Sequence, residues 1–428
     1  MAHQAHAIPW GVLSSNFKFT SKSARHGDET NLFPRKNPAQ GKELMYFAHG
    51  FAQAVESMSR TERENYPSSY DVTGSNDLLI DDVTESKIRN TVRRYRMAIT
   101  RGKQRGYCPS PCPVTYMHGC TCPLSPVDRS ILPWKLEDNL NQCVEYPSPH
   151  HDSTELFKTL LLHGQIDALL RIAAQPSASI EIIWAPVCCR GQIGWGELMR
   201  STLMSYICLN VSFLKPETYD ATARAAYLRE EHRNPPTKPE DLDYRKAEGY
   251  ERMLKRCTAR AAYGVHLYPH QEFFGVGPDG SVDQNWRDSN PTMPVLETHN
   301  LHEYMPLRSD IPVVTRYLQQ KGLPLELAPE VLDHAEYIPR RRLPIADDPL
   351  HPENSEELRK YLKYCWKLLV WCNVVAEGTG KKINWVYEIT QCILDLWGVD
   401  ELKRRTIHYY VIDREYLQLP RVDGYSFI

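Results

Sequence analysis

Several features that would assign a chain to a functional class are missing from this sequence. Neither charge is in excess, since 51 Lys+Arg residues stand against 53 Asp+Glu residues; this excludes a protein that coats nucleic acid over its whole surface. No apolar run approaches the ~20 residues that span a bilayer, so we expect no membrane segment. The opening MAHQAHAIPW lacks the basic and apolar regions of a secretory signal. We therefore expect a soluble intracellular protein.

Catalytic signatures are also missing. The sequence contains no G-x-S-x-G, H-E-x-x-H or G-x-G-x-x-G pattern, so we do not expect an enzyme and no cofactor is implied. Without a secretory signal, the 12 cysteines are expected to be reduced thiols, metal ligands or small core residues rather than a disulfide framework.

Composition and apolar periodicity predict a helix-rich α+β protein with short strands in a mixed middle domain and a helical C-terminal domain. The strands are expected at Ile180–Val187 and Tyr263–Val276, and a long helix at Ser153–Ala174. Five segments are predicted: a poorly ordered tail (1–40), a helical segment with a basic helix (41–106), a Pro/Cys-rich loop (107–150), the α+β domain (151–310) and the helical C-terminal domain (311–428).

The basic helix is the clearest charged feature. Ile88, Val92 and Tyr95 form one apolar face, and Thr84 is a candidate N-cap. Eight positive charges with no acidic residue among them follow Ser86: Lys87, Arg89, Arg93, Arg94, Arg96, Arg101, Lys103 and Arg105. Such a run suits a nuclear-import signal bound by an import receptor, or phosphate contacts to nucleic acid; a solvated face paired with nearby acidic residues remains an alternative.

The Pro/Cys-rich loop contains four thiols close together, Cys108-x3-Cys112-x7-Cys120-x-Cys122, with His118 beside them. Zinc binds four such ligands tetrahedrally and could hold a proline-rich loop that has no core of its own. The spacing lacks paired C-x2-C knuckles, so unliganded reduced thiols are the alternative. His266 and His270 would share one face of the predicted strand and form a second, weaker metal hypothesis; core or surface histidines are the alternative.

Residues 322–344 read GLPLELAPEVLDHAEYIPRRRLP. Leu323, Pro324, Leu327, Val331 and Leu332 resemble the opening of an F-box, in which a Leu-Pro pair leads into short helices that bury leucines against an adaptor. Arg340, Arg341 and Arg342 stand where an F-box would continue with apolar helix. The alternative is an ordinary helical hairpin within this domain's own core. We expect the C-terminal helices to bind a protein partner.

The run from Leu323 through RRRLPIADDPLHPENSEELRKYLKYCWKLLV resembles segments of proteins from filamentous ascomycete fungi. The combination of a basic segment and a helical C-terminus is similar to the hypoxia-responsive morphology factors. That resemblance implies a nuclear regulatory protein that alters the expression of neighbouring genes and the architecture of colonies or biofilms.

Together these features predict a regulatory protein located in the nucleus, with the cytoplasm as the alternative. Two other hypotheses stay open. One is an F-box-like protein-interaction adaptor, and the other is a metal-dependent enzyme centred on the middle domain.

Overall fold

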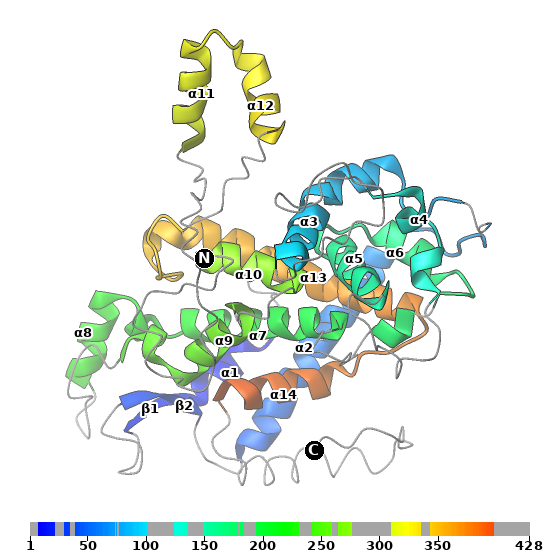
Figure 1. Cartoon of the computed structure of the whole chain (residues 1–428). Helices are drawn as coiled ribbons and strands as arrows, with labels where there is room; N and C mark the ends of the chain where they lie inside the picture. Colours follow the sequence, from blue (N-terminus) through cyan, green and yellow to red (C-terminus); the bar gives the residue numbers. More distant parts are fainter. Residues whose placement is uncertain are drawn as a thin grey trace.

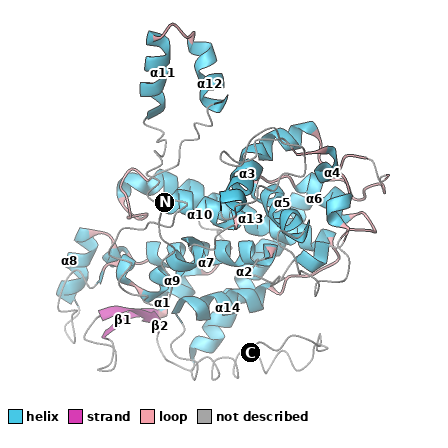
Figure 2. Ribbon diagram, in the orientation of Figure 1, coloured by secondary structure: helices cyan, strands magenta, loops and turns pink. Residues whose placement is uncertain are grey.

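The computed structural model describes residues 7–21, 30–34, 39–72, 74, 77–101, 124–135, 149–178, 180–183, 194–230, 242–258, 264–275, 310–334 and 343–397. Within these ranges the protein is built from helices, with a single pair of short strands (Figure 2). The helix-rich class is confirmed. The mixed α+β middle domain is not seen, because every element described between 151 and 310 is helical.

The strands and the α-helices are labelled in chain order (Figure 1). Their bounds are α1 Trp10–Ser15, β1 Phe17–Ser21, β2 Thr30–Pro34, α2 Ala39–Arg63, α3 Asp82–Arg101, α4 Pro126–Arg129, α5 Pro149–Leu162, α6 Ile166–Ala173, α7 Trp195–Phe213, α8 Ala221–Glu230, α9 Glu248–Thr258, α10 Tyr268–Phe274, α11 Asp310–Gln320, α12 Ala328–His334, α13 Ser355–Gly378 and α14 Trp385–Trp397.

Short 3₁₀ helices connect several of these elements. They are η1 Leu132–Trp134, η3 Ile180–Ile183, η4 Pro216–Thr218, η6 Tyr244–Lys246, η7 Val265–Leu267, η9 Leu325–Leu327 and η10 Pro352–Asn354.

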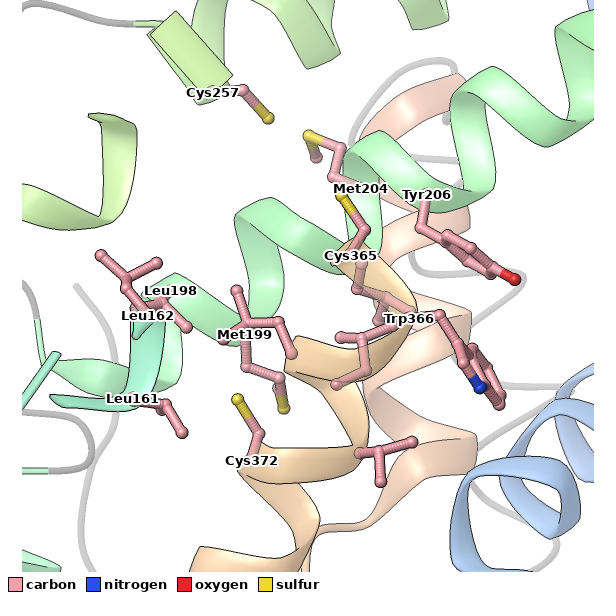
Figure 3. Packing of buried hydrophobic residues seen from close by; sticks show 14 of the residues in the cluster. Leu161, Leu162, Leu198, Met199, Met204, Tyr206, Cys257, Cys365, Trp366 and Cys372 are labelled. Carbon is pink, nitrogen blue, oxygen red and sulfur yellow. The ribbon is translucent and has the colours of Figure 1, made fainter. Parts of the chain in front are cut away.

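The core forms around α7 and α13, which pack on each other and on α2, α9 and α14. Helix α7 is apolar or small on nearly every side and is buried along almost its whole length, as expected for a central helix. Figure 3 shows Met199 and Met204 of α7 beside Cys372 and Cys365 of α13. The unbranched thioethers and small thiols fill the space between the two helices.

Ion pairs fix the outer helices against this core. Arg256 of α9 binds Glu197 of α7 through two hydrogen bonds of 2.8 and 3.0 Å, and it also reaches Asp395 of α14. Arg200 of α7 makes a second two-bond pair with Glu388 of α14. Such paired guanidinium–carboxylate contacts set the relative positions of α7, α9 and α14.

The N-terminal residues differ from the expected disordered tail. Trp10 of α1 is buried against Phe47 and Phe51 of α2, and Phe17 of β1 packs edge-on against Trp397 at the end of α14. Strand β1 pairs antiparallel with β2. The predicted tail is polar in composition, but its few aromatic residues bind it to the core.

Both predicted strands of the middle region are wrong. Ile180–Ile183 is the 3₁₀ helix η3, and the rest of that predicted strand lies outside the described residues. Residues 264–275 form η7 and α10 instead of a strand. Pro269, at the first turn of α10, pre-sets a helical φ there.

The predicted helix Ser153–Ala174 is two helices, α5 and α6. The break falls at Gly164, whose φ of +62° lies in the left-handed region that favours glycine. Helix α3 also begins earlier than expected, because Asp81 and not Thr84 is its cap: the Asp81 carboxylate accepts a 2.7 Å hydrogen bond from the Thr84 N–H. None of the helices described here combines the length and apolar character that crossing a membrane requires.

Candidate functional site

A charged pair lies wholly inside the protein. Glu155 and Lys158, one turn apart on α5, form an ion pair of 2.5 Å, and their side chains are 1% and 0% exposed. The second carboxylate oxygen of Glu155 accepts a hydrogen bond of 2.9 Å from the N–H of Val265. The desolvation cost of two buried charges is offset only when the pair has good geometry and its other polar atoms are bonded. Glu155 meets both conditions.

Two buried histidines lie next to this pair. The Nδ1 of His270 on α10 is 2.5 Å from the hydroxyl of Tyr361 on α13, whose ring stacks on Phe273. His266 of η7 is also buried, and its Nδ1 has no hydrogen-bond partner within the part of the chain described. Its neighbours include Lys158 and His270, which disfavour a positive charge on it.

A hydroxyl and a thiol extend the cluster toward α7 and α9. The Oγ of Ser205 lies 3.0 Å from the Sγ of Cys257, and the same thiol donates to the carbonyl of Ser201. We call Glu155, Lys158, Ser205, Cys257, His266, His270 and Tyr361 the buried polar cluster. Its members come from α5, α7, α9, η7, α10 and α13, so it ties six elements together.

Burial sets the protonation of this cluster. It lowers the pKa of His270 to about 3 and that of His266 well below 6.5, so both imidazoles are neutral at neutral pH. Burial also raises the pKa of Cys257 to about 12 and that of Tyr361 well above 10. A thiol kept protonated in this way is a poor nucleophile. The arrangement therefore suits a structural role better than acid–base or nucleophilic catalysis.

The metal hypotheses gain no support from the described residues. Among them, no group of three or more His, Cys, Asp or Glu side chains could hold an ion. His266 and His270 lie on η7 and α10 rather than on one face of a strand. The four thiols Cys108, Cys112, Cys120 and Cys122 lie outside the described residues, and the zinc hypothesis for them stays a prediction.

The basic helix is α3. Its predicted apolar face is confirmed, since Ile88, Val92 and Tyr95 are buried and α3 packs on α5. The hydroxyl of Thr91 also lies 2.8 Å from the Nε2 of His163, next to the corner between α5 and α6. Lys87 is exposed.

One positive charge of this helix is paired with a carboxylate of the same helix. Arg89 is bound by Glu85 of the preceding turn, which offsets one charge. The side chains of Arg93, Arg94, Arg96 and Arg101 lie outside the part of the chain whose side chains the structure describes, so their role stays a prediction. Positions 103 and 105 lie outside the described residues.

The segment that resembles an F-box contains η9 and α12, which form a helical hairpin with the preceding helix α11. Figure 1 shows this hairpin standing apart from the other labelled helices. Leu327 and Val331 are exposed, Pro324 is exposed, Leu323 is half-buried, and Leu332 is buried with Ala328 on the side that packs on α11. The structure therefore brings the five predicted partner-binding residues together on one protruding element.

Of the buried polar cluster, the sequence singled out only His266 and His270, and as metal ligands rather than as core residues. The stretch Ser153–Leu162 reads as an amphipathic helix whose charged residues would face water. In the structure α5 is covered by α3, α6, α7, α13, η1 and η7, so its polar side is buried too. The signal for the ion pair is weak: Glu155 and Lys158 stand three positions apart among the apolar residues Leu156, Phe157 and Leu160.

These features define a helix-rich protein with a sealed polar core, a basic helix and an exposed apolar hairpin. Over residues 11–409 the chain matches the family described as "Gramillins biosynthetic cluster protein GRA5", and it belongs to this family of fungal biosynthetic-cluster proteins. No curated protein and no solved structure matches the chain significantly.

Proposed function

We propose that this protein is a regulatory protein associated with a fungal biosynthetic gene cluster, acting in the nucleus and modulating gene expression and, through it, colony and biofilm morphology. The family supports the association with a cluster. The similarity to hypoxia-responsive morphology factors supports the regulatory role. The observation that carries the proposal is α3, a helix anchored by one apolar face and otherwise rich in positive charge.

The anchoring of α3 suits both uses of its charge. Because Ile88, Val92 and Tyr95 hold the helix on α5, its remaining surface is presented without the entropy cost of ordering a free segment. An import receptor would bind it through its positive charges, and nucleic acid through phosphate contacts that release counterions. The buried polar cluster supports a binding role rather than a catalytic one, since its groups are enclosed, its two charged side chains pair with each other and its histidines are neutral.

The test is the location of a fluorescently tagged full-length chain in a filamentous fungus. We expect nuclear fluorescence that moves to the cytoplasm in the triple variant Arg93→Ala, Arg94→Ala, Arg96→Ala. The matched control is Arg359→Ala, Lys360→Ala, Lys363→Ala, which removes three exposed positive charges from α13 and should leave the protein nuclear. Cytoplasmic fluorescence of the unmodified chain would contradict the proposal.

A second candidate function is an F-box-like adaptor. The exposed side chains of Leu327 and Val331 favour it, because such leucine-rich helices bind an adaptor groove through apolar anchors. An adaptor would co-purify with a ubiquitin-ligase scaffold and lose it on Leu327→Asp, but not on Met58→Asp, which changes an equally exposed side chain on α2. The metal-dependent enzyme gains no support from the residues that the structure describes.

A further inference from the structure

The hairpin of α11 and α12 exposes several large apolar side chains. Val313 and Tyr317, four residues apart on α11, are 48% and 63% exposed. Leu327 and Val331, also four apart, are 42% and 37% exposed. Among the hairpin side chains that the structure describes, Ala328 and Leu332 are the buried ones. A hairpin that exposes such stripes is stabilised when another apolar surface covers it.

The two stripes lie on one face. On α11 the half-buried positions 311, 314, 315 and 318 mark the inner side, and on α12 Ala328 and Leu332 do. Taking helical register from these inner sides, Val313 and Tyr317 point to the same side of the hairpin as Leu327 and Val331. We call these four residues the hairpin face.

The charges of the hairpin are sorted between its two arms. Among the side chains described, the α11 arm carries Arg316 and ends at Lys321, whereas the η9–α12 arm carries Glu326 and Glu330; Asp310, the first residue of α11, is the acidic exception on its arm. All four described side chains are exposed, and within the described residues none is paired with an opposite charge. Arg316 and Glu330 lie seven residues before and seven residues after Leu323, and therefore at similar heights along the two arms.

We infer that the occupant of the hairpin face is a second copy of this chain. A two-fold axis parallel to the hairpin places α11 of one copy over α12 of the other, antiparallel and with both turns at the same end. Arg316 then lies at the height of Glu330 of the other copy, and the contact is repeated by the symmetry. The arrangement in which the turns point in opposite directions brings basic arm against basic arm and is disfavoured.

This inference goes beyond the proposed function, which α3 carries, and it names a partner for the hairpin. The resulting four-helix interface buries Val313, Tyr317, Leu327 and Val331 of both copies, with the charged side chains at its rim. A dimer would present two basic helices at once, which raises the avidity for an extended polyanion without any new contact.

Sedimentation velocity of the purified full-length chain tests the inference. We expect a concentration-dependent dimer that Leu327→Asp and Tyr317→Asp convert to monomer, while Met58→Asp on α2 does not. The rim charges provide a test that leaves every apolar side chain in place. Arg316→Glu alone and Glu330→Arg alone should each raise the dimer dissociation constant about tenfold, because each puts two like-charge pairs in the interface.

The double variant Arg316→Glu, Glu330→Arg restores opposite charges and should return the dissociation constant to its original value. Lys363→Glu, an exposed charge reversal on α13, is the control and should have no effect. Circular dichroism confirms that each variant is folded. A monomer at every concentration, a dimer insensitive to Leu327→Asp, or a double variant no better than the single ones would overturn the inference.

Different results would contradict the proposed nuclear function and the proposed dimer. A monomeric chain that is still nuclear and regulatory would contradict the dimer and leave the proposed function in place. Capture of a ubiquitin-ligase scaffold through Leu327 would contradict the dimer and favour the adaptor. A dimer formed through the hairpin by a chain that stays in the cytoplasm would reject the proposed nuclear function and keep the inference.

Discussion

Lys158 and Glu155 contribute to this fold in a way that surface ion pairs do not. Both side chains are enclosed, and Glu155 also holds the N–H of Val265 at the start of η7. Removing one partner of a buried pair leaves an uncompensated charge, whereas removing both often costs little. The contribution of the pair to the free energy of unfolding therefore depends on both side chains being present.

We predict that Lys158→Met lowers the free energy of unfolding at pH 7 by about 3–5 kcal/mol, because it leaves the carboxylate of Glu155 buried and unpaired. Adding Glu155→Gln should recover most of this loss, since the amide oxygen can still accept from Val265. Urea denaturation measures both values. Lys363→Met, at an exposed site on α13, should change stability by no more than about 0.5 kcal/mol. A double variant as unstable as Lys158→Met would show that the pairing is not the cause.

His266 and His270 should make stability depend on pH. Burial lowers the pKa of His270 to about 3 and that of His266 well below 6.5, whereas both groups titrate near 6.5 in the unfolded chain. Below that pH the unfolded chain binds protons that the folded chain does not. The stability is therefore fully present above pH 6.5 and is lost as the pH falls toward 3.

For the two histidines together we expect a loss of about 2.5 kcal/mol between pH 7 and 5.5, measured by urea denaturation at each pH. His270→Gln should halve this dependence. Tyr361→Phe removes the hydrogen bond with His270 but leaves both histidines in place, so it should lower stability equally at every pH. A pH dependence unchanged by His270→Gln would contradict the assignment.

At the scale of elements, the corner between α5 and α6 shows how one residue divides a periodic sequence. Gly164 has a positive φ, and a Cβ added there would lie 2.7 Å from the ring of Trp371 on α13. That ring cannot easily move, because its Nε1 donates to Glu62 on α2. Apolar periodicity continues across residues 153–174, so periodicity alone predicts one helix.

We expect Gly164→Ala to destabilise the protein by about 2–4 kcal/mol, since it adds a clash with Trp371 to the cost of a left-handed backbone. Gly380→Ala is the matched control, because Gly380 also has a positive φ, +71°, but open space around it. It should cost about 1–2 kcal/mol, the backbone contribution alone. Thermal unfolding of the two variants separates these contributions, and equal losses would exclude a role for Trp371.

The elements that were predicted correctly share strong local signals. The basic helix α3 is the clearest case, because its apolar residues recur at steps of three and four along the chain. The wrong predictions fell on short segments. Ile180–Ile183 and Val265–Leu267 are rich in β-branched or aromatic neighbours, which favour a strand locally, but the packing around them is entirely helical.

At the scale of the whole molecule, one hydrophobic core contains residues from several of the five segments predicted from the sequence. Buried residues from Ile8 to Trp397 belong to a single cluster, in which Trp10 lies against Tyr206 and Phe17 lies against Trp397. The predicted tail and C-terminal helices therefore contact the same central helix. The hairpin of α11 and α12 lies outside this core, which leaves its apolar face open for a partner.

The sequence by itself determined the helix-rich class, the long helices and the apolar face of the basic helix, because these depend on residues close together in the chain. Only the tertiary structure decided which polar residues are buried. Glu155 and Lys158 look like a solvated face until α7, α13 and η7, which are distant in sequence, cover them. Burial is a property of the neighbours that a residue meets in the folded chain, and local periodicity does not specify those neighbours.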